Sequence, residues 1–342
     1  MRSLRSLRYI VLLTCVALTT AAQELKPPPK PAPAPAKWRG LIGEYGPDSD
    51  IVIILEKDGV LTALRKRTDY QPLSEISPDA FRVVAGPAHT EQRVVFTRNR
   101  AGRATSLTLN GITFQRRNIE PETGNQLHIT PVRPVPELMK EALAATPPKE
   151  SGEFLPTDLV ELAKLDPTIH LEVRYATTNN FVGTKFYSAE RAFMQRPAAE
   201  AVVRASRKLK PLGYGLLIHD AYRPWYVTKV FWDATPADKH IFVADPAKGS
   251  RHNRGCAVDL TLYDLKTGRP VEMVSTYDET TDRAYPDYPG GTSLQRWHRA
   301  LLRQAMESEG FTVYEAEWWH FDYKDFQKYR IGNLTFEQIG KR

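Results

Sequence analysis

Residues 250–262, the most informative stretch of the sequence, read Ser250-Arg-His252-Asn-Arg-Gly255-Cys-Ala-Val-Asp259-Leu-Thr-Leu. From residue 256 to 263 apolar residues occupy every second position, which is the period of a β-strand with one buried face. The opposite face then carries Asp259 between Ala257 and Thr261, two small residues that leave room beside the carboxylate. The residues that share the apolar face are Cys256, Val258, Leu260 and Leu262.

The sequence on both sides of this strand mixes helical and strand periods. Residues 198–210 suit a helix, and apolar residues recur at helical spacing over 294–306 before Gly310, which ends the pattern. His298 falls outside the apolar stripe of its helix, so we expect its side chain to be solvated. Strand patterns are found at 171–175, 214–219 and 311–321. Together they predict an α+β domain in which helices pack on an antiparallel sheet.

A second informative stretch is Glu317-Trp318-Trp319-His320-Phe321. In a regular strand Glu317 and His320 would point to opposite faces, so we predict a turn at the start of the strand that brings them together. A carboxylate and an imidazole among three aromatic residues are costly to bury unless the charge has a partner. A metal ion is such a partner.

His252, Asp259 and His320 supply two imidazoles and one carboxylate, a three-ligand set suited to catalytic zinc with a fourth position left for water. Glu317 is then available as a general base that takes a proton from the water and returns it to the leaving group. Alternation alone leaves open that Asp259 is only a solvent-facing strand residue. The nearby His252 and Gly255 favour the metal site.

A third stretch, residues 219–224, reads His219-Asp-Ala-Tyr-Arg223-Pro and follows a predicted buried strand. From this strand end the Arg223 guanidinium could stabilise negative charge on a carbonyl oxygen. Most arginines are surface residues, so this signal is weak by itself. We interpret His219 as a core histidine near the site rather than a fourth ligand, and Cys256 as a small buried hydrophobe.

These three stretches resemble, in their order along the chain, the D-alanyl-D-alanine dipeptidase family of zinc peptidases. The resemblance runs from about Leu155 to the end of the sequence and includes Val173-Arg-Tyr-Ala-Thr-Thr-Asn-Asn-Phe181. It implies a compact α+β fold like the signalling domain of hedgehog, with one zinc ion per chain. The roles it implies are zinc ligands for His252, Asp259 and His320, catalytic base for Glu317, and stabilisation of the tetrahedral intermediate for Arg223.

The same resemblance implies that Tyr175, Ser250 and Asp278 hold the small substrate, D-alanyl-D-alanine or a related D,D-dipeptide from bacterial cell wall. An acidic residue suits a free α-amino group, which would exclude longer chains blocked at that end. One alternative is a D,D- or L,D-carboxypeptidase that acts on longer stem peptides. Another is a zinc-bearing binding module without turnover, against which Glu317 argues. The oligomeric state stays open.

Residues 38–118 predict a small antiparallel β module. Asp58-Gly59, Ala101-Gly102 and Asn110-Gly111 are turn dipeptides between strand-like segments. The module contains no acid, base or metal constellation, and it resembles the β modules appended to secreted bacterial hydrolases. The strand-like segments are 51–55, 60–64, 81–84, 93–97 and 105–109.

The first 22 residues have the order of a secretory signal: three arginines, an apolar run and then small residues up to Ala22. The run is shorter than the roughly 20 residues that span a bilayer. We therefore expect cleavage near Ala22, no transmembrane segment afterwards, and a periplasmic or secreted protein; lipid attachment at Cys15 is the less favoured alternative. The expected later segments are a Pro-rich linker (23–37), a linker with a short helix near 135–145 (119–152) and the zinc peptidase domain (153–342).

The overall charge points to no polyanionic partner. The 342 residues carry a net charge of +7, and removing Arg2, Arg5 and Arg8 with the signal leaves +4. Since no long basic run remains, nucleic-acid binding is not indicated. Cys256 is then the one cysteine left, so the chain cannot form an internal disulfide.

Overall fold

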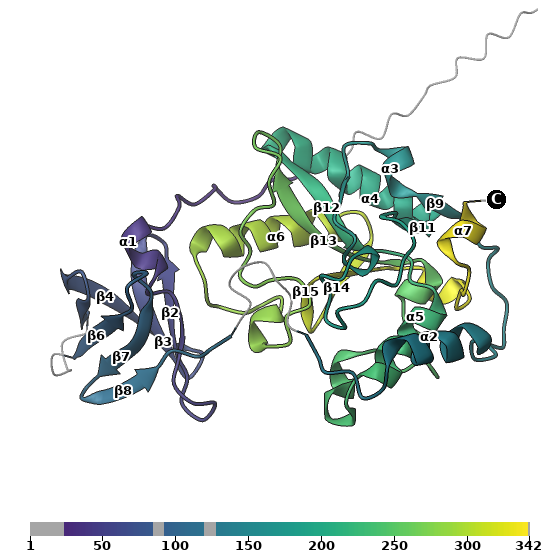
Figure 1. The fold of residues 1–342 in the computed structure, drawn as a ribbon. Helices are drawn as coiled ribbons and strands as arrows, with labels where there is room; N and C mark the ends of the chain where they lie inside the picture. The colour runs from purple at the N-terminus through teal and green to yellow at the C-terminus, as the bar shows by residue number, and fades with distance from the viewer. Residues whose placement is uncertain (1–23, 85–91, 120–127, 341–342) are drawn as a thin grey trace, which may run out of the picture.

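The computed structural model describes residues 24–84, 92–119 and 128–340. The predicted export signal, including Cys15, lies outside the described residues. Within them, two folded units follow one another along the chain (Figure 1). No helix in the described ranges is both long enough and apolar enough to cross a membrane.

The first unit is the predicted β module, an eight-stranded antiparallel meander in which each strand pairs with the next. The turns at 58–59 and 110–111 have positive φ at both residues, as tight hairpins require. The sheet curls so that its first and last strands approach each other, and there the Gly46 amide donates a hydrogen bond to the Gln115 carbonyl. The strands are β1 (Gly43–Tyr45), β2 (Val52–Lys57), β3 (Val60–Arg65), β4 (Asp69–Ser77), β5 (Ala80–Val83), β6 (Arg93–Arg98), β7 (Ala104–Leu109) and β8 (Ile112–Gln115).

The second unit is built on a five-stranded sheet of order β10-β12-β13-β15-β14. All neighbouring pairs are antiparallel except β10 and β12, which run parallel, so the sheet is mixed at one edge rather than fully antiparallel. The strands are β10 (His170–Leu171), β12 (Tyr214–Asp220), β13 (Ala257–Asp264), β14 (Phe311–Tyr314) and β15 (Glu317–Tyr323). A separate two-stranded sheet pairs β9 (Leu159–Glu161) with β11 (Phe193–Gln195).

Helices α4 and α6 pack on the five-stranded sheet, whereas α2 and α5 pack on each other (Figure 1). The apolar face of β13 packs with α4 and α6, as its alternation predicts. Its residues Val258, Leu260 and Leu262 have no exposed surface, and neither does Cys256, which precedes the strand. The prediction for His298 is wrong: this α6 residue is buried and lies 3.1 Å from the Tyr214 hydroxyl. The helices are α1 (Ala36–Arg39), α2 (Val135–Ala144), α3 (Leu162–Leu165), α4 (Arg196–Leu209), α5 (Trp225–Ala234), α6 (Ser293–Glu307) and α7 (Phe336–Ile339).

The predicted strand 171–175 is also wrong. Strand β10 ends at Leu171, and the chain then forms a 3-10 turn over Arg174–Ala176. The turn carries Tyr175 into an aromatic cluster, where its ring centroid lies 4.8 Å from that of Phe231. The alternation of apolar residues here therefore reflects burial in a turn, which period alone does not distinguish from a strand.

Two segments expected as linkers pack on the second unit. In the Pro-rich segment, the Pro28 carbonyl accepts a hydrogen bond from the Trp297 indole (2.9 Å), and Lys30 lies over the Tyr214 ring. Within 119–152, helix α2 buries Leu138 and Ala142 against α5. Neither packed part is therefore a solvated spacer.

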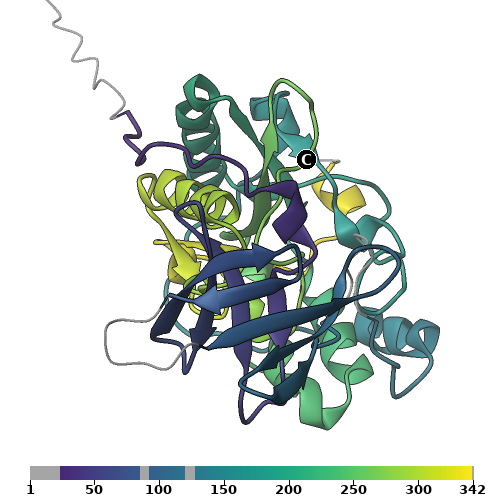
Figure 2. The same ribbon diagram turned by 90° about the vertical axis from the view of Figure 1, so that its left-hand side faces the viewer.

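The module docks on the loop that joins β13 to α6 and on the first turn of α6, and it lies in front of the second unit in Figure 2. The buried Glu56 carboxylate accepts hydrogen bonds from the Ser293 amide (2.7 Å) and the Ser293 hydroxyl (3.1 Å). The buried Glu44 carboxylate accepts one from the Tyr288 hydroxyl (2.7 Å). Two buried carboxylates therefore fix the module to the loop.

Candidate metal centre and active site

Strand pairing and one glycine position the three predicted ligands. Asp259 on β13 lies directly opposite His320 on β15 in the antiparallel register. His252 lies in a 3-10 turn just before β13, and this turn ends at Gly255 with a φ of +70°. A side chain at Gly255 would be strained at that φ and would also lie 2.6 Å from Leu159. The Gly255 turn therefore places His252 beside the strand.

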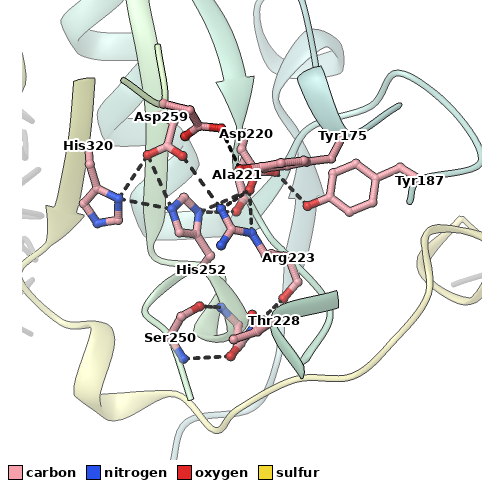
Figure 3. Close-up of polar contacts among 12 residues, drawn as sticks. Tyr175, Tyr187, Asp220, Ala221, Arg223, Thr228, Ser250, His252, Asp259 and His320 are labelled. Atoms are coloured by element: carbon pink, nitrogen blue, oxygen red, sulfur yellow. Dashed lines mark hydrogen bonds and ion pairs between the residues drawn. The ribbon is translucent and has the colours of Figure 1, made fainter. Parts of the chain in front are cut away.

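The three side chains converge on one buried point (Figure 3). His320 Nδ1 lies 3.0 Å from Asp259 Oδ1 and 3.1 Å from His252 Nε2. His252 Nε2 lies 3.4 Å from Asp259 Oδ1. A tetrahedral zinc with bonds of about 2.0–2.1 Å separates its ligand atoms by roughly 3.3 Å. The spacing therefore fits the three corners of such a site.

The outer contacts of the two histidines turn their inner nitrogens into metal donors. His252 Nδ1 lies 2.7 Å from the Ala221 carbonyl, which can only accept a hydrogen bond. His320 Nε2 lies 2.9 Å from Asp322 Oδ1 in the same way. In a neutral imidazole the opposite nitrogen then presents a lone pair. Asp259 Oδ1, the third inner atom, contacts only these two imidazoles and is otherwise buried without a hydrogen-bond donor, an environment that suits a cation.

Without a metal ion, a proton serves as that cation. Burial alone would lower the pKa of His320, but its contacts with Asp259 and Asp322 raise it to about 10. Burial alone would raise the pKa of Asp259, but His252 and His320 hold it well below its usual range. The carboxylate therefore stays charged and attracts a positive partner.

Glu317 lies beside this cluster because β15 bulges. Tyr314 on β14 pairs with Glu317, whereas its neighbour Val313 pairs with Phe321, so the register shifts between them. The chain turns just before Glu317, as predicted, and the bulge then brings Glu317 Oε2 to 3.8 Å from His320 Nδ1. Both side chains thus reach the same side of the sheet.

The Glu317 carboxyl is adapted to exchange a proton near neutral pH. Burial raises the pKa of Glu317 to about 7, with His320 opposing the rise and Asp259 adding to it. An acid that ionises near the working pH both accepts and donates a proton readily. The carboxyl can therefore act as a base and then as an acid.

Arg223 is held rigidly next to the cluster. Its Nε and one terminal nitrogen contact Asp220 Oδ2 at 2.9 and 2.8 Å, and the same terminal nitrogen lies 3.9 Å from Asp259 Oδ2. The guanidinium lies over the rings of Tyr175 and Phe231. Burial would lower its pKa, but Asp220 raises it well above the usual value, so Arg223 stays charged.

The structure brings together two of the three predicted substrate residues. The Tyr175 hydroxyl donates to Asp278 Oδ2 at 2.9 Å, and Asp278 adopts a left-handed φ of +58°. Ser250 lies apart from Tyr175 in Figure 3, and its hydroxyl accepts a hydrogen bond from the Asn253 amide. Ser250 therefore shapes the turn that precedes β13.

Sequence reasoning missed Tyr277, Asp220 and Asp322. The Tyr277 hydroxyl donates to Asp259 Oδ2 at 3.0 Å, and its ring stacks on His219 at 4.8 Å between centroids. Burial lowers the pKa of His219 to about 3, so this histidine is neutral in the wall of the site. Asp220 and Tyr277 each adjoin a residue that the motifs singled out, which was the available signal.

Comparisons with known proteins agree with this arrangement. A model of the peptidase M15 family, described as D-ala-D-ala dipeptidase, matches residues 156–337, more than half of the chain. A D-alanyl-D-alanine dipeptidase of Escherichia coli (strain K12) is 33% identical over 175 residues, covering 51% of this chain and 89% of that protein. A D-alanyl-D-alanine dipeptidase of Enterococcus faecalis is 35% identical over 178 residues, covering 46% of this chain and 88% of that protein. A crystal structure of SurE covers 26% of this chain and 21% of its own, with 22% identity and a TM-score of 0.22, too little to support an argument. The chain belongs to the D-Ala-D-Ala dipeptidase family of M15 peptidases.

Proposed function

We propose that this protein is a zinc-dependent dipeptidase that hydrolyses D-alanyl-D-alanine or a closely related D,D-dipeptide. The observation that carries the proposal is the convergence of His252, Asp259 and His320 on one point, with the Glu317 carboxylate beside them. Membership of the peptidase family supports hydrolysis of a peptide bond.

The ligand set matches a catalytic zinc site: two imidazole nitrogens and one carboxylate oxygen. A zinc ion held there would supply Lewis acidity, polarising the scissile carbonyl and making a water molecule more acidic. Asp322 and the Ala221 carbonyl hold the two imidazoles in the required orientation.

Glu317 moves the proton in both halves of the reaction. Its carboxylate accepts a proton from the attacking water and then delivers it to the amine that leaves. In the metal-free chain burial raises the pKa of Glu317 to about 7, so its carboxyl holds a proton more readily than an exposed glutamate does.

Arg223 stabilises the negative charge that develops on the carbonyl oxygen. Because Asp220 and two aromatic rings already fix the guanidinium, little reorganisation is needed when the charge forms. The charge stays on Arg223 at every working pH, since its pKa is raised further.

Asp278 and Tyr175 provide a place for the free α-ammonium group of a dipeptide. The Asp278 carboxylate supplies the negative charge, and the Tyr175 hydroxyl holds that carboxylate in position. A longer peptide has an uncharged amide in place of the ammonium, so it would leave the carboxylate without its partner. This is why we favour a dipeptidase over a carboxypeptidase.

The test combines metal analysis with hydrolysis of D-alanyl-D-alanine and of a pentapeptide stem by the full chain. We expect one zinc per chain and hydrolysis of the dipeptide alone. Glu317→Gln should keep zinc but lose roughly 10²–10⁴-fold in kcat, the usual contribution of a general base. Glu315→Gln, which changes an exposed carboxylate two residues away, is the matched control. An active Glu317→Gln enzyme would refute the assigned base, and cleavage of the pentapeptide would favour the carboxypeptidase.

We also propose that the enzyme acts outside the cytoplasm, in turnover or scavenging of wall peptides. The support is the order of charged, apolar and small residues up to Ala22. N-terminal sequencing of the protein recovered from the envelope or medium of a bacterial host tests this proposal. A start near residue 23 supports export, and an intact first segment in the cytoplasm contradicts it.

A further inference from the structure

A cavity of about 860 Å³ lies between the β module and the peptidase domain. Arg39, Ile42 and Glu44 belong to its module wall, and His219, Thr261 and Tyr277 to its peptidase wall. The three metal ligands and Glu317 do not line it, so it is distinct from the metal centre. Its volume lies within the roughly 300–1,000 Å³ typical of small-molecule sites.

The lining carries an excess of positive charge, with five arginines and three glutamates. Two of the arginines have unused hydrogen-bonding capacity. Arg39 has no ion-pair partner among the described residues, and Arg174 Nε is buried without a hydrogen bond, although the Arg174 terminal nitrogen pairs with Glu172. Arginine is the residue best suited to bind a carboxylate.

Two hydroxyls on the cavity wall also lack partners. Thr261 is 5% exposed, and its Oγ1 makes no hydrogen bond. The Oγ1 of Thr276 is also buried without a hydrogen bond. Buried hydroxyls are almost always satisfied, so an unsatisfied pair on residues that line one cavity favours a ligand with hydrogen-bonding groups of its own. The backbone of a peptide supplies such groups.

Size and apolar contacts favour a peptide over a simple anion. One water occupies about 30 Å³, so an inorganic phosphate would leave most of the cavity to solvent. Ile42, Met273 and Leu294 add apolar surface to the lining. We propose that this cavity is a second binding site, which takes a short peptide with a free carboxylate.

Tyr277 connects this second site to the metal centre. Its ring lines the cavity, and its hydroxyl donates to Asp259, a predicted zinc ligand. A ligand that contacts Tyr277 or the stacked His219 therefore contacts the wall that separates the two sites. The site goes beyond the proposed hydrolysis, because it depends on the module as well as on the peptidase domain.

The test measures equilibrium binding to the full chain by calorimetry, with N-acetyl-D-alanyl-D-alanine, its C-terminal amide and inorganic phosphate as probes. We expect the acid to bind, and the amide and phosphate to bind at least about tenfold more weakly, the factor that one charge-assisted hydrogen bond is worth. Because binding is the readout, the result does not depend on whether the enzyme hydrolyses D-alanyl-D-alanine.

Two variants locate the binding. Thr261→Val keeps the side-chain shape and removes the unsatisfied hydroxyl, and Arg39→Gln removes an exposed charge, so both should fold normally. Each should weaken binding of the acid several-fold, while Arg207→Gln, an exposed change on α4, should not. No binding of the acid, equal binding of acid and amide, equal binding of phosphate, or indifference to both variants would overturn the proposal.

Discussion

His320 is held between two carboxylates, with Asp259 on its inner nitrogen and Asp322 on its outer one. Asp322 also pairs with Arg251 at 3.0 Å, so its carboxylate is fixed in turn. Asp322→Asn should lower zinc affinity by about 10–100-fold, the usual effect of losing such an outer partner. Competition with a chromogenic chelator measures this affinity. Asp325→Asn, a nearby aspartate that pairs only with Lys328 among the described contacts, should leave it unchanged.

The same histidine predicts how zinc binding depends on pH. In the metal-free chain, burial alone would lower the pKa of His320, but Asp259 and Asp322 raise it from 6.5 to about 10. The bound proton therefore stabilises the metal-free fold below pH 6.5, and this stabilisation is lost as the pH rises towards 10. Zinc must displace that proton, so its affinity should increase over the same interval.

Thermal unfolding with and without zinc checks this prediction. The difference between the two unfolding midpoints should widen as the pH is raised from 6.5 towards 10. A constant or shrinking difference would show that His320 carries no extra proton in the metal-free chain.

At the scale of the element, the turn that ends at Gly255 decides where His252 lies. Gly255→Ala would be strained at φ +70° and would press a new methyl to 2.6 Å from Leu159. Gly268→Ala is the matched control, since its φ is +67° but nothing lies within 4 Å of the new atom. Both variants should lose about 1–2 kcal/mol of folding stability, because an alanine is strained in the left-handed region. Urea unfolding should show a larger loss for Gly255→Ala, which should also weaken zinc binding; equal losses would contradict this account.

Elements were predictable from sequence where one face is core and the other is not. In β13, apolar residues alternate with Ala257, Asp259 and Thr261, so its apolar face and the direction of the Asp259 side chain were predicted, although both faces are buried. Strand β4 was missed because most of its residues are exposed and carry no apolar period. The 3-10 turn at Tyr175 looked like a strand, because burial in an aromatic cluster depends on distant residues such as Phe231.

The candidate site also contains residues that the sequence predicted and residues that it could not predict. Motifs predicted the three residues that the structure brings together around one point, since each motif places a ligand at a strand or just before it. Tyr277 was not found because its contact with Asp259 depends on how the loop between β13 and α6 folds back. That loop has no period of its own, so only the folded chain shows its path.

For the whole molecule, the position of the module matters because it docks on that same loop. Residues 271–292 carry Tyr277 and Asp278 at one end and Tyr288, which bonds the module's Glu44, at the other. Glu56 fixes the next residues, at the start of α6. The module thus contacts one end of the loop, while at the other end Asp278, which we propose binds substrate, contacts Tyr175.

Glu56→Ala tests this coupling. Glu56 is 2% exposed and accepts hydrogen bonds from the Ser293 amide, the Ser293 hydroxyl and the Gly59 amide, so its removal leaves buried donors unpaired. The free energy of unfolding, measured in urea, should fall by about 1–3 kcal/mol. Glu75→Ala, which removes a surface partner of Lys37 in the same module, should cost less than about 1 kcal/mol. Because the loop carries Asp278 but not Glu317, KM for D-alanyl-D-alanine should rise in the Glu56 variant with kcat nearly unchanged. A fall in kcat at constant KM would mean that the module acts on the metal centre and not on the substrate loop.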